Sequence, residues 1–130
     1  MNIQLSNASG VPIYLQIKRQ LKAAIIAGEL AAGEKLPSIR FLAKELRVSV
    51  ITTKRAYDDL EVEGFIHSVQ GKGSYVSVQN KELIREEQLR KVEASLISAL
   101  QQARLVGLHI EDVHQILDTL GEDSDGDECN

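Results

Sequence analysis

One continuous stretch decides the fold of this chain: residues 36–76, which read LPSIRFLAKELRVSVITTKRAYDDLEVEGFIHSVQGKGSYV. Apolar residues recur at helical spacing twice within it, over 39–46 and over 50–63, and each repeat follows a serine that can cap a helix. Two β-rich runs follow, 65–70 and 74–78, and the glycine-rich tip between them predicts a hairpin. Helix, turn, helix and hairpin in this order are the layout of a winged helix-turn-helix.

The second of these helices carries side chains of opposite character on its two faces. Its back has helical spacing and predicts the contacts of this helix with the core: Thr53, Ala56, Tyr57 and Leu60. Its front carries hydrogen-bonding and charged groups beside an apolar one: Ile51, Thr52, Lys54, Arg55 and Asp58. Such a helix is expected to lie on the core of the domain with its front in solvent.

Upstream of this stretch, the sequence predicts an arm and one more helix. Residues 1–10 are polar and rich in Asn, Ser and Gly, which is typical of a flexible arm. A helix is predicted over 12–27, with Pro12 at its first helical position, where a missing N–H has no cost. Lys18, Arg19 and Lys22 are predicted to lie on the face of this helix that is opposite its apolar residues.

Downstream, the pattern changes to that of a long helix. Its apolar seam has the spacing of a coiled coil and comprises Leu89, Val92, Leu96, Leu100 and Ala103. Gly107 breaks this helix, and a last helix carries a second apolar set: Val113, Ile116, Leu117 and Leu120. Residues 121–130 are acidic and are expected to be disordered. Because the seam needs an apolar partner, we expect it to pack on the last helix and the domain of its own chain, and we expect the last helix to complete a dimeric bundle.

The predicted fold class is therefore mostly α with a small β-wing. The expected organisation is a flexible arm (1–10), a winged helix-turn-helix domain (11–78, with the helix-turn-helix over about 38–63 and the wing over 65–78), a helical dimerisation segment (79–120) and a disordered acidic tail (121–130).

Charge is distributed unevenly between the two parts of the chain. The net charge of −4 by itself argues against a nucleic-acid partner. However, residues 1–78 carry ten Lys and Arg against seven Asp and Glu, a net +3, whereas residues 79–130 carry five against twelve, a net −7. This asymmetry points to a basic binding module followed by an acidic partner segment.

The front of the 50–63 helix suits double-stranded DNA. The major groove of B-DNA admits an α-helix and displays base edges that differ for each base pair. Ser49 and Thr52 can contact phosphates or base edges, and Lys54 and Arg55 can pair with phosphates or guanine acceptors. Two interpretations of Ile51 stay open: it meets a thymine methyl group, or it packs against the wing or the preceding helix.

Two cationic groups outside this helix are further candidates for DNA contacts. Arg40 lies in the first turn of the 39–46 helix, from which it can reach a phosphate or enter the groove. Lys72 lies at the hairpin tip and can reach the adjacent minor groove. Gly71 and Gly73 beside it allow close approach of the backbone, although a tight turn alone also explains them.

The motifs in combination resemble the GntR family of bacterial transcription regulators. They read L-P-S-x-R-x-L-A-x-E-L-x-V-S from residue 36, T-x-K-R-A-Y-x-x-L-E-x-E-G-F-I from residue 52, and G-K-G-S-Y-V from residue 71. P-I-Y-L-Q-I and G-E-L-x-x-G-x-K-L, from residues 12 and 28, fit the same pattern. The resemblance covers about residues 11–78 and implies a module that binds palindromic operators as a dimer.

The resemblance also implies which residues contact DNA. The residues that match the family's DNA-contacting positions are Arg40, Ser49, Thr52, Lys54, Gly71 and Lys72. Two positions depart from the family pattern. Val50 stands where many members have Arg, and Lys54 stands where Arg is common, which favours a point contact over a bidentate one. Both departures bear on the operator sequence.

The segment after residue 78 is too short for a ligand-sensing domain. Two helices cannot enclose a pocket of about 300 Å³ or more without a partner chain. The short two-helix tail is similar to that of the YtrA-like branch of the family, in which it serves dimerisation. This resemblance implies a repressor of its own operon and of neighbouring transporter genes. A small-molecule effector bound at the dimer interface is compatible with this function.

Other functions have little support in the sequence. G-K-G-S at 71–74 lacks the first glycine of a phosphate-binding loop, and no helix follows it. His109 and His114 are five residues apart, so they do not share one helix face and cannot hold one metal ion. We therefore expect no enzyme, no metal and no cofactor. A winged helix that binds proteins without specific DNA binding is the alternative to a DNA-binding regulator.

The location of the protein is predicted from what the sequence lacks. No apolar run approaches the length of about 20 residues that spans a bilayer. Residues 1–10 contain neither the cationic nor the apolar region of a secretion signal. The single cysteine, Cys129, cannot form a disulfide within the chain, which fits a reducing compartment. The sequence therefore predicts a cytoplasmic protein with no membrane partner.

Overall fold

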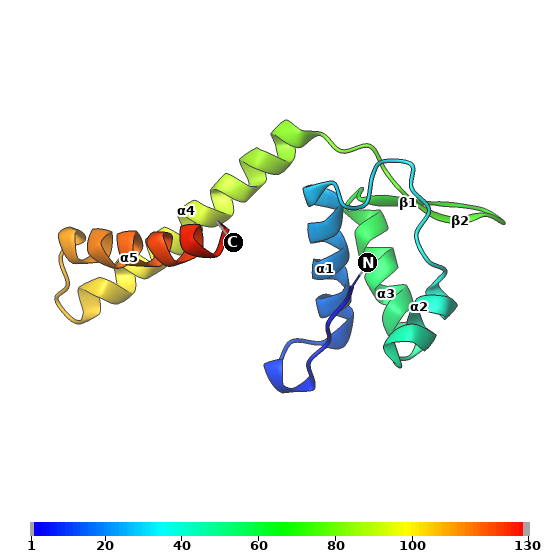
Figure 1. The fold of residues 1–130 in the computed structure, drawn as a ribbon, viewed down its shortest axis with the longest axis horizontal. Coiled ribbons are helices and arrows are strands. Elements are labelled where there is room, and N and C mark those ends of the chain that lie inside the picture. The colour runs from blue at the N-terminus through cyan, green and yellow to red at the C-terminus, as the bar shows by residue number, and fades with distance from the viewer. Residues whose placement is uncertain (1, 129–130) are drawn as a thin grey trace. The chain divides into compact units, whose positions relative to one another are not determined.

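The computed structural model describes residues 2–128 and divides the chain into two compact units, residues 1–81 and 82–130. Unit 1 contains a short 3-10 helix η1 (Asn7–Ser9), helices α1 (Ile13–Ala27), α2 (Ile39–Leu46) and α3 (Val50–Val62), and strands β1 (Ile66–Val69) and β2 (Gly73–Val76). Unit 2 consists of α4 (Lys81–Leu105) and α5 (Ile110–Glu128). The predicted fold class, mostly α with a small β-wing, is confirmed (Figure 1).

Helix α3 lies at the centre of unit 1 and packs against α1, α2 and β1 (Figure 1). Its buried side chains are the four that the helical spacing predicted: Thr53, Ala56, Tyr57 and Leu60. The most deeply buried partners from the other elements are Ile17 and Leu21 on α1 and Ile66 and Val76 on the hairpin. This core holds α3 from behind, which leaves its opposite face in solvent.

Local signals explain the bounds of α2 and α3. The Ser38 hydroxyl accepts from the backbone N–H of Phe41 at 3.1 Å, and the Ser49 hydroxyl accepts from that of Thr52 at 3.0 Å. Each serine therefore satisfies one of the free N–H groups at a helix start. Between the helices, Arg47 has a φ of 57° and donates its N–H back to α2. A left-handed residue here ends α2 and reverses the chain.

The wing is an antiparallel hairpin that projects from the helices (Figure 1). Its register pairs Ile66 with Val76 and Val69 with Gly73. A third extended segment, 34–36, borders β2 on its other side, because Leu36 donates to the carbonyl of Ser74 and Val76 donates to the carbonyl of Glu34, each at 2.9 Å. At the base of the wing, β2 is thus hydrogen-bonded to β1 on one side and to segment 34–36 on the other. The tip of the wing has no backbone hydrogen bond to segment 34–36.

The first residues do not form the flexible arm that their composition predicted. Gln20 exchanges two hydrogen bonds with the backbone of Gln4, at 2.8 and 2.7 Å, and Gln16 does the same with Ser6, at 2.8 Å each. The two glutamines lie one turn apart on α1, so their amides fit alternate residues of an extended chain. The prediction was wrong because side chains of α1 supply hydrogen-bond partners to the backbone of these residues. Pro12 also lies one position earlier than predicted, at the N-cap of α1.

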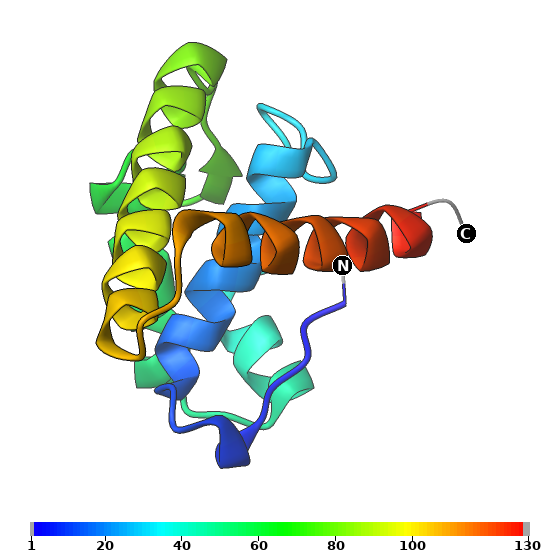
Figure 2. The same cartoon turned by 90° about the vertical axis from the view of Figure 1, so that its left-hand side faces the viewer.

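Unit 2 consists of two helices that run in different directions from the turn between them (Figure 2). Gly107, with a φ of 74°, lies in this turn, as predicted for the break. Ala103 is buried at its start. Helix α5 continues to Glu128, whereas disorder was expected for residues 121–130. No proline interrupts 110–128, so the backbone hydrogen bonds of the helix can continue into the acidic segment. Residues 129 and 130 lie outside the described part.

Among the described residues, no helix combines the length and the apolar character that crossing a membrane requires.

Candidate nucleic-acid interface

The outer face of α3 presents an apolar residue to solvent near its first turn. The side chain of Ile51 is 81% exposed and that of Val50 is 45% exposed. The interpretation in which Ile51 packs against the wing or α2 is therefore wrong. Exposure of a β-branched side chain has no benefit for a lone domain, but such a residue can contact a thymine methyl group in the major groove.

The start of α3 places two hydroxyl groups beside this apolar residue. Ser49 Oγ accepts from the backbone N–H of Thr52 and donates to Thr52 Oγ1 at 2.8 Å. The hydroxyl of Ser49 is thus occupied by the cap, whereas Thr52 Oγ1 accepts and keeps its own hydrogen to donate. The positive end of the helix dipole lies at the same turn, so this end of α3 suits an anion such as a phosphate.

Lys54 lies on the exposed side of α3 and forms an ion pair with Asp58, one turn further along the helix. Lys54 Nζ is 2.7 Å from Asp58 Oδ2, and the two side chains are 61% and 54% exposed. An exposed pair of this kind contributes little to stability, about 0.3–0.5 kcal/mol. Lys54 is therefore readily available to an outside partner.

Arg55 takes a different position from the other predicted contacts. Its guanidinium carbon lies 3.8 Å from the ring centre of Tyr14, on α1. This stacking occupies one planar face of the guanidinium, while the side chain as a whole stays exposed. The sequence placed Arg55 with Lys54 on one front, but the structure turns it toward α1, because an aromatic side chain is available there.

Arg40 is exposed in the first turn of α2, and the start of this helix is held by α3. The Tyr57 hydroxyl donates to the carbonyl of Pro37 at 2.7 Å. Burial raises the pKa of Tyr57 to about 12, so the hydroxyl keeps its proton at neutral pH. The hydrogen bond fixes the residues before Arg40 at the level of Tyr57 on α3. Sequence analysis assigned Tyr57 to the core alone and missed this positioning role.

The tip of the wing carries Lys72 in an exposed position. Lys72 donates its backbone N–H to the carbonyl of Val69 at 2.9 Å, and Gly71 has a φ of 77°. A Cβ atom on Gly73 would lie 3.2 Å from Lys35 Cε, and the φ of Gly73 is 116°. The glycines are thus explained by turn geometry and by the close approach of Lys35, with Lys72 left free to reach outward.

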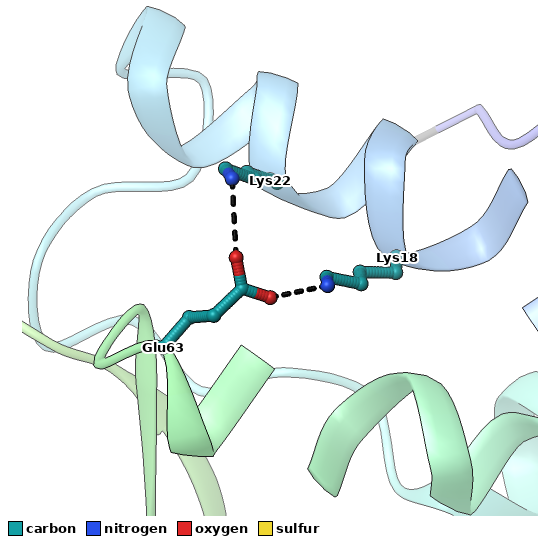
Figure 3. A network of polar contacts seen from close by, with 3 residues as sticks. All are labelled: Lys18, Lys22 and Glu63. Carbon is teal, nitrogen blue, oxygen red and sulfur yellow. Dashed lines mark hydrogen bonds and ion pairs between the residues drawn. The ribbon is translucent and has the colours of Figure 1, made fainter. Parts of the chain in front are cut away.

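Two lysines that sequence analysis placed opposite the apolar residues of α1 bind the end of α3 (Figure 3). Glu63 pairs with Lys18 through one oxygen and with Lys22, at 3.2 Å, through the other. Burial alone would raise the pKa of Glu63, but hydrogen bonds and the charges of both lysines outweigh it and hold this pKa below its ordinary value. Lys22 Nζ also lies 5.0 Å from the ring centre of Phe65.

This cluster fixes the junction of α3 and the wing against α1. It also removes two cations from the set that is available for a polyanion. The i, i+4 spacing of Lys18 and Lys22 was visible in the sequence, but their common partner lies far along the chain. Spacing alone therefore could not reveal the contact.

Comparisons with known proteins agree with this geometry. The model of the gntR family of bacterial regulatory proteins matches residues 13–76, which include every element of the winged helix. The HTH-type transcriptional repressor YtrA of Bacillus subtilis (strain 168) is 32% identical over 128 residues, which are 98% of this chain and 98% of that protein.

Solved structures support the same assignment. The transcriptional antiterminator from Listeria monocytogenes EGD-e has a TM-score of 0.71 and 30% identity, over 95% of this chain and 92% of that chain. The DNA-binding domain of AraR in complex with operator ORE1 has a TM-score of 0.51 and 30% identity, over 59% of this chain and 94% of that chain. Fold, exposed α3 face and full-length similarity together show that the chain belongs to the gntR family of bacterial regulatory proteins, which are transcriptional regulators and not enzymes.

Proposed function

We propose that the protein is a homodimeric regulator that binds a palindromic DNA operator and represses transcription in the bacterial cytoplasm. The observation that carries this proposal is the outer face of α3, where an 81% exposed isoleucine lies beside hydroxyl and ammonium groups. Base edges in the major groove require this mixture of apolar contact and hydrogen bonding. The similarity to a DNA-binding domain in complex with its operator supports DNA binding by unit 1.

The proposed contacts divide into two groups. We assign Thr52, Arg40 and Lys72 to phosphates, contacts that position the helix without reading sequence. We assign Ile51, Val50 and Lys54 to base edges. The complete proposed set is Arg40, Ser49, Val50, Ile51, Thr52, Lys54, Gly71 and Lys72, with Arg55 stacked on Tyr14 at the edge of the set.

Dimerisation is proposed from the apolar side chains that unit 2 leaves in water. Leu96 is 41% exposed and Ile116 is 51% exposed, and similar exposure is found for Leu89, Val92, Leu117 and Leu120. Burial of apolar surface contributes about 25 cal/mol per Å². A second copy of the same two helices offers a matching apolar surface. Leu100 and Ala103 belong to the seam of α4, and Val113 belongs to the apolar set of α5. We therefore assign α4 and α5 to the dimer interface.

A two-fold dimer predicts the form of the operator. Two copies of α3 that face one side of the duplex require half-sites about one helical turn apart, or a multiple of it. The operator should then be an inverted repeat. The transporter operon that the YtrA-like resemblance implies as a target would carry this repeat upstream of its first gene.

Selection from randomised duplexes with the full-length protein, followed by footprinting of the selected site, tests this function. We expect an inverted repeat protected on one face. Truncation after Lys81 should give a monomer whose affinity for the same duplex is much lower, as measured by fluorescence anisotropy and sedimentation. Selection without any consensus would favour the protein-interaction alternative, and a dimeric truncated protein would remove α4 and α5 from the interface.

A groove in unit 2 makes a small-molecule effector a second candidate feature. It has a volume of about 380 Å³ and is lined by residues of both helices, among them Ser95, Gln102, Leu108 and Val113. A second copy packed on the seam would close it further. Thermal unfolding in the presence of a metabolite panel tests this, since a ligand that binds only the folded state raises the midpoint. No shift with any metabolite would count against an effector.

A further inference from the structure

Asp58 stands on a surface where a negative charge is unfavourable for a DNA-binding domain. Two acids near the end of α3 face parts of unit 1: Glu61 accepts from the Ser68 hydroxyl at 2.8 Å, and Glu63, the C-cap residue of α3, binds Lys18 and Lys22. The partner of Asp58 is Lys54 on the same helix, and its side chain is 54% exposed. Its charge is therefore directed to the outside of the domain and does not brace α3 against another element.

The position of Asp58 on the helix places it among the base-facing residues. It lies seven residues after Ile51, which is two helical turns, so the two side chains share one face. A carboxylate on this face is repelled by phosphates on both sides of the groove. Lys54 offsets part of this repulsion, and a hydrogen-bond donor on a base edge would offset more of it. Cytosine N4 is the donor that carboxylates accept from in the major groove.

The ion pair itself matches one base pair. Lys54 Nζ offers donors and Asp58 Oδ2 offers an acceptor, 2.7 Å apart. A G·C pair presents the complementary order in the major groove: the acceptors N7 and O6 of guanine, then the N4 amino donor of cytosine. We propose that Asp58 is a specificity-determining residue, which accepts from cytosine N4 while Lys54 donates to the guanine of the same pair.

An A·T pair fits the same two head groups less well, because the donor that the carboxylate needs is flanked by acceptors on both sides. Its only major-groove donor, adenine N6, lies between two acceptors, adenine N7 and thymine O4. The carboxylate of Asp58 would then meet an acceptor on one side whichever way Lys54 turned. Each half-site should therefore contain one G·C pair that the Lys54–Asp58 pair reads, in a fixed orientation.

This inference rests on the proposed function, and one experiment separates the two. Randomised duplexes are selected with the full-length wild type and with Asp58→Ala, and every position of the wild-type consensus is then varied singly in a binding assay. For the wild type, exchange of the one G·C pair for A·T should weaken binding about ten-fold or more. Asp58→Ala should lose discrimination at this pair alone, in each half-site.

Four further variants sharpen the result. Lys54→Ala should lose discrimination at the same pair, and the double variant should lose no more than either single variant, because both residues read one pair. Asp58→Asn should shift the preference there toward A·T, since Asn pairs with adenine N6 and N7. Glu29→Gln, which removes one exposed carboxylate elsewhere in unit 1, is the matched control and should leave all base preferences unchanged.

The outcomes are distinct. If Asp58 merely neutralises Lys54, Asp58→Ala will tighten binding to all duplexes alike and steepen the salt dependence, which overturns the assignment. Loss of discrimination at different pairs for Lys54→Ala and Asp58→Ala also overturns it. A consensus that Asp58→Ala reproduces unchanged rejects this assignment alone, whereas a wild-type selection without consensus rejects the proposed function as well. Circular dichroism confirms that each variant is folded.

Discussion

The two units of the chain differ in how far they bury their apolar side chains. In unit 1, Ile17, Leu21 and Leu60 have no solvent exposure, because three helices and a hairpin surround them. In unit 2, the 25-residue helix α4 buries only Ala103 among the residues described. The difference shows that unit 1 closes its own core, while the leucines of unit 2 are suited to a partner. Stability of the first should depend on the chain alone, and stability of the second on its concentration.

The largest effect on the free energy of unfolding is expected for a substitution in the core of unit 1. Leu60→Ala should lower the free energy of unfolding by about 2–5 kcal/mol, because it removes a fully buried side chain and leaves a cavity. Urea denaturation followed by circular dichroism measures this loss, which should be the same at low and high protein concentration.

Leu96→Ala is the matched control, since it deletes the same atoms from a side chain that is 41% exposed in one copy. Its effect should be largest at high protein concentration and should vanish as the protein is diluted to a monomer, because it weakens association and not the fold of the single chain. A concentration-independent loss of the same size as that of Leu60→Ala would show that unit 2 does not need a partner.

A smaller effect is expected for the hydrogen bond that joins α3 to the start of α2. Tyr57→Phe should cost about 0.5–1.5 kcal/mol in the free energy of unfolding. Because the pKa of Tyr57 is raised from its ordinary value of 10.0 to about 12, the wild type should also lose stability as the pH rises from about 10 to 12. Tyr57→Phe should lack this loss. Its DNA affinity should fall at neutral pH if Arg40 depends on the bond, and unchanged affinity would contradict the positioning role.

The lysine cluster at the end of α3 predicts a stability effect of about 1 kcal/mol for Glu63→Gln. The pKa of Glu63 is lowered in the folded state, so its contribution is complete above the ordinary value of 4.5 and is lost as the pH falls through the folded value. The difference in unfolding free energy between wild type and Glu63→Gln should therefore shrink in acid. If this difference in unfolding free energy did not change with pH, the charge of Glu63 would not be its cause.

The smallest expected effect concerns the turn between α2 and α3. Arg47 has a φ of 57°, a conformation that costs a residue with a side chain about 1–2 kcal/mol. Arg47→Gly relieves this strain but gives the unfolded chain more freedom, so we expect a net stabilisation of about 0.5 kcal/mol. Thermal unfolding measures the gain, and Arg47→Ala, which keeps a Cβ atom, is the control that should show none.

Predictions from sequence succeeded where the signal was local. The predicted helix over 39–46 has the same bounds in α2, and the four predicted buried residues of α3 are its buried residues. Serine caps, apolar spacing and glycine turns act within a few residues of each other, so they can be recognised in a linear sequence. The same spacing predicted the exposed face of α3, because the residues that do not lie on its buried face must lie in solvent.

Predictions failed where contacts join segments far apart in the chain. Composition alone made residues 1–10 an arm, but Gln16 and Gln20 bind their backbone. Helical spacing placed Lys18 and Lys22 opposite the apolar residues of α1, but Glu63 lies against both. One further failure has a local cause: disorder was expected after residue 120, yet α5 extends to Glu128, because no proline interrupts its backbone hydrogen bonds.

The sequence by itself determined the winged helix, its recognition helix and its family, because these depend on short-range patterns. Only the tertiary structure decided which charges stay available for DNA. It turns Arg55 onto Tyr14, binds Lys18 and Lys22 to Glu63, and leaves Lys54 with Asp58 on the outer face. The reason is physical: a side chain's charge has the same sign everywhere, but its partner is set by which distant segment the fold brings beside it.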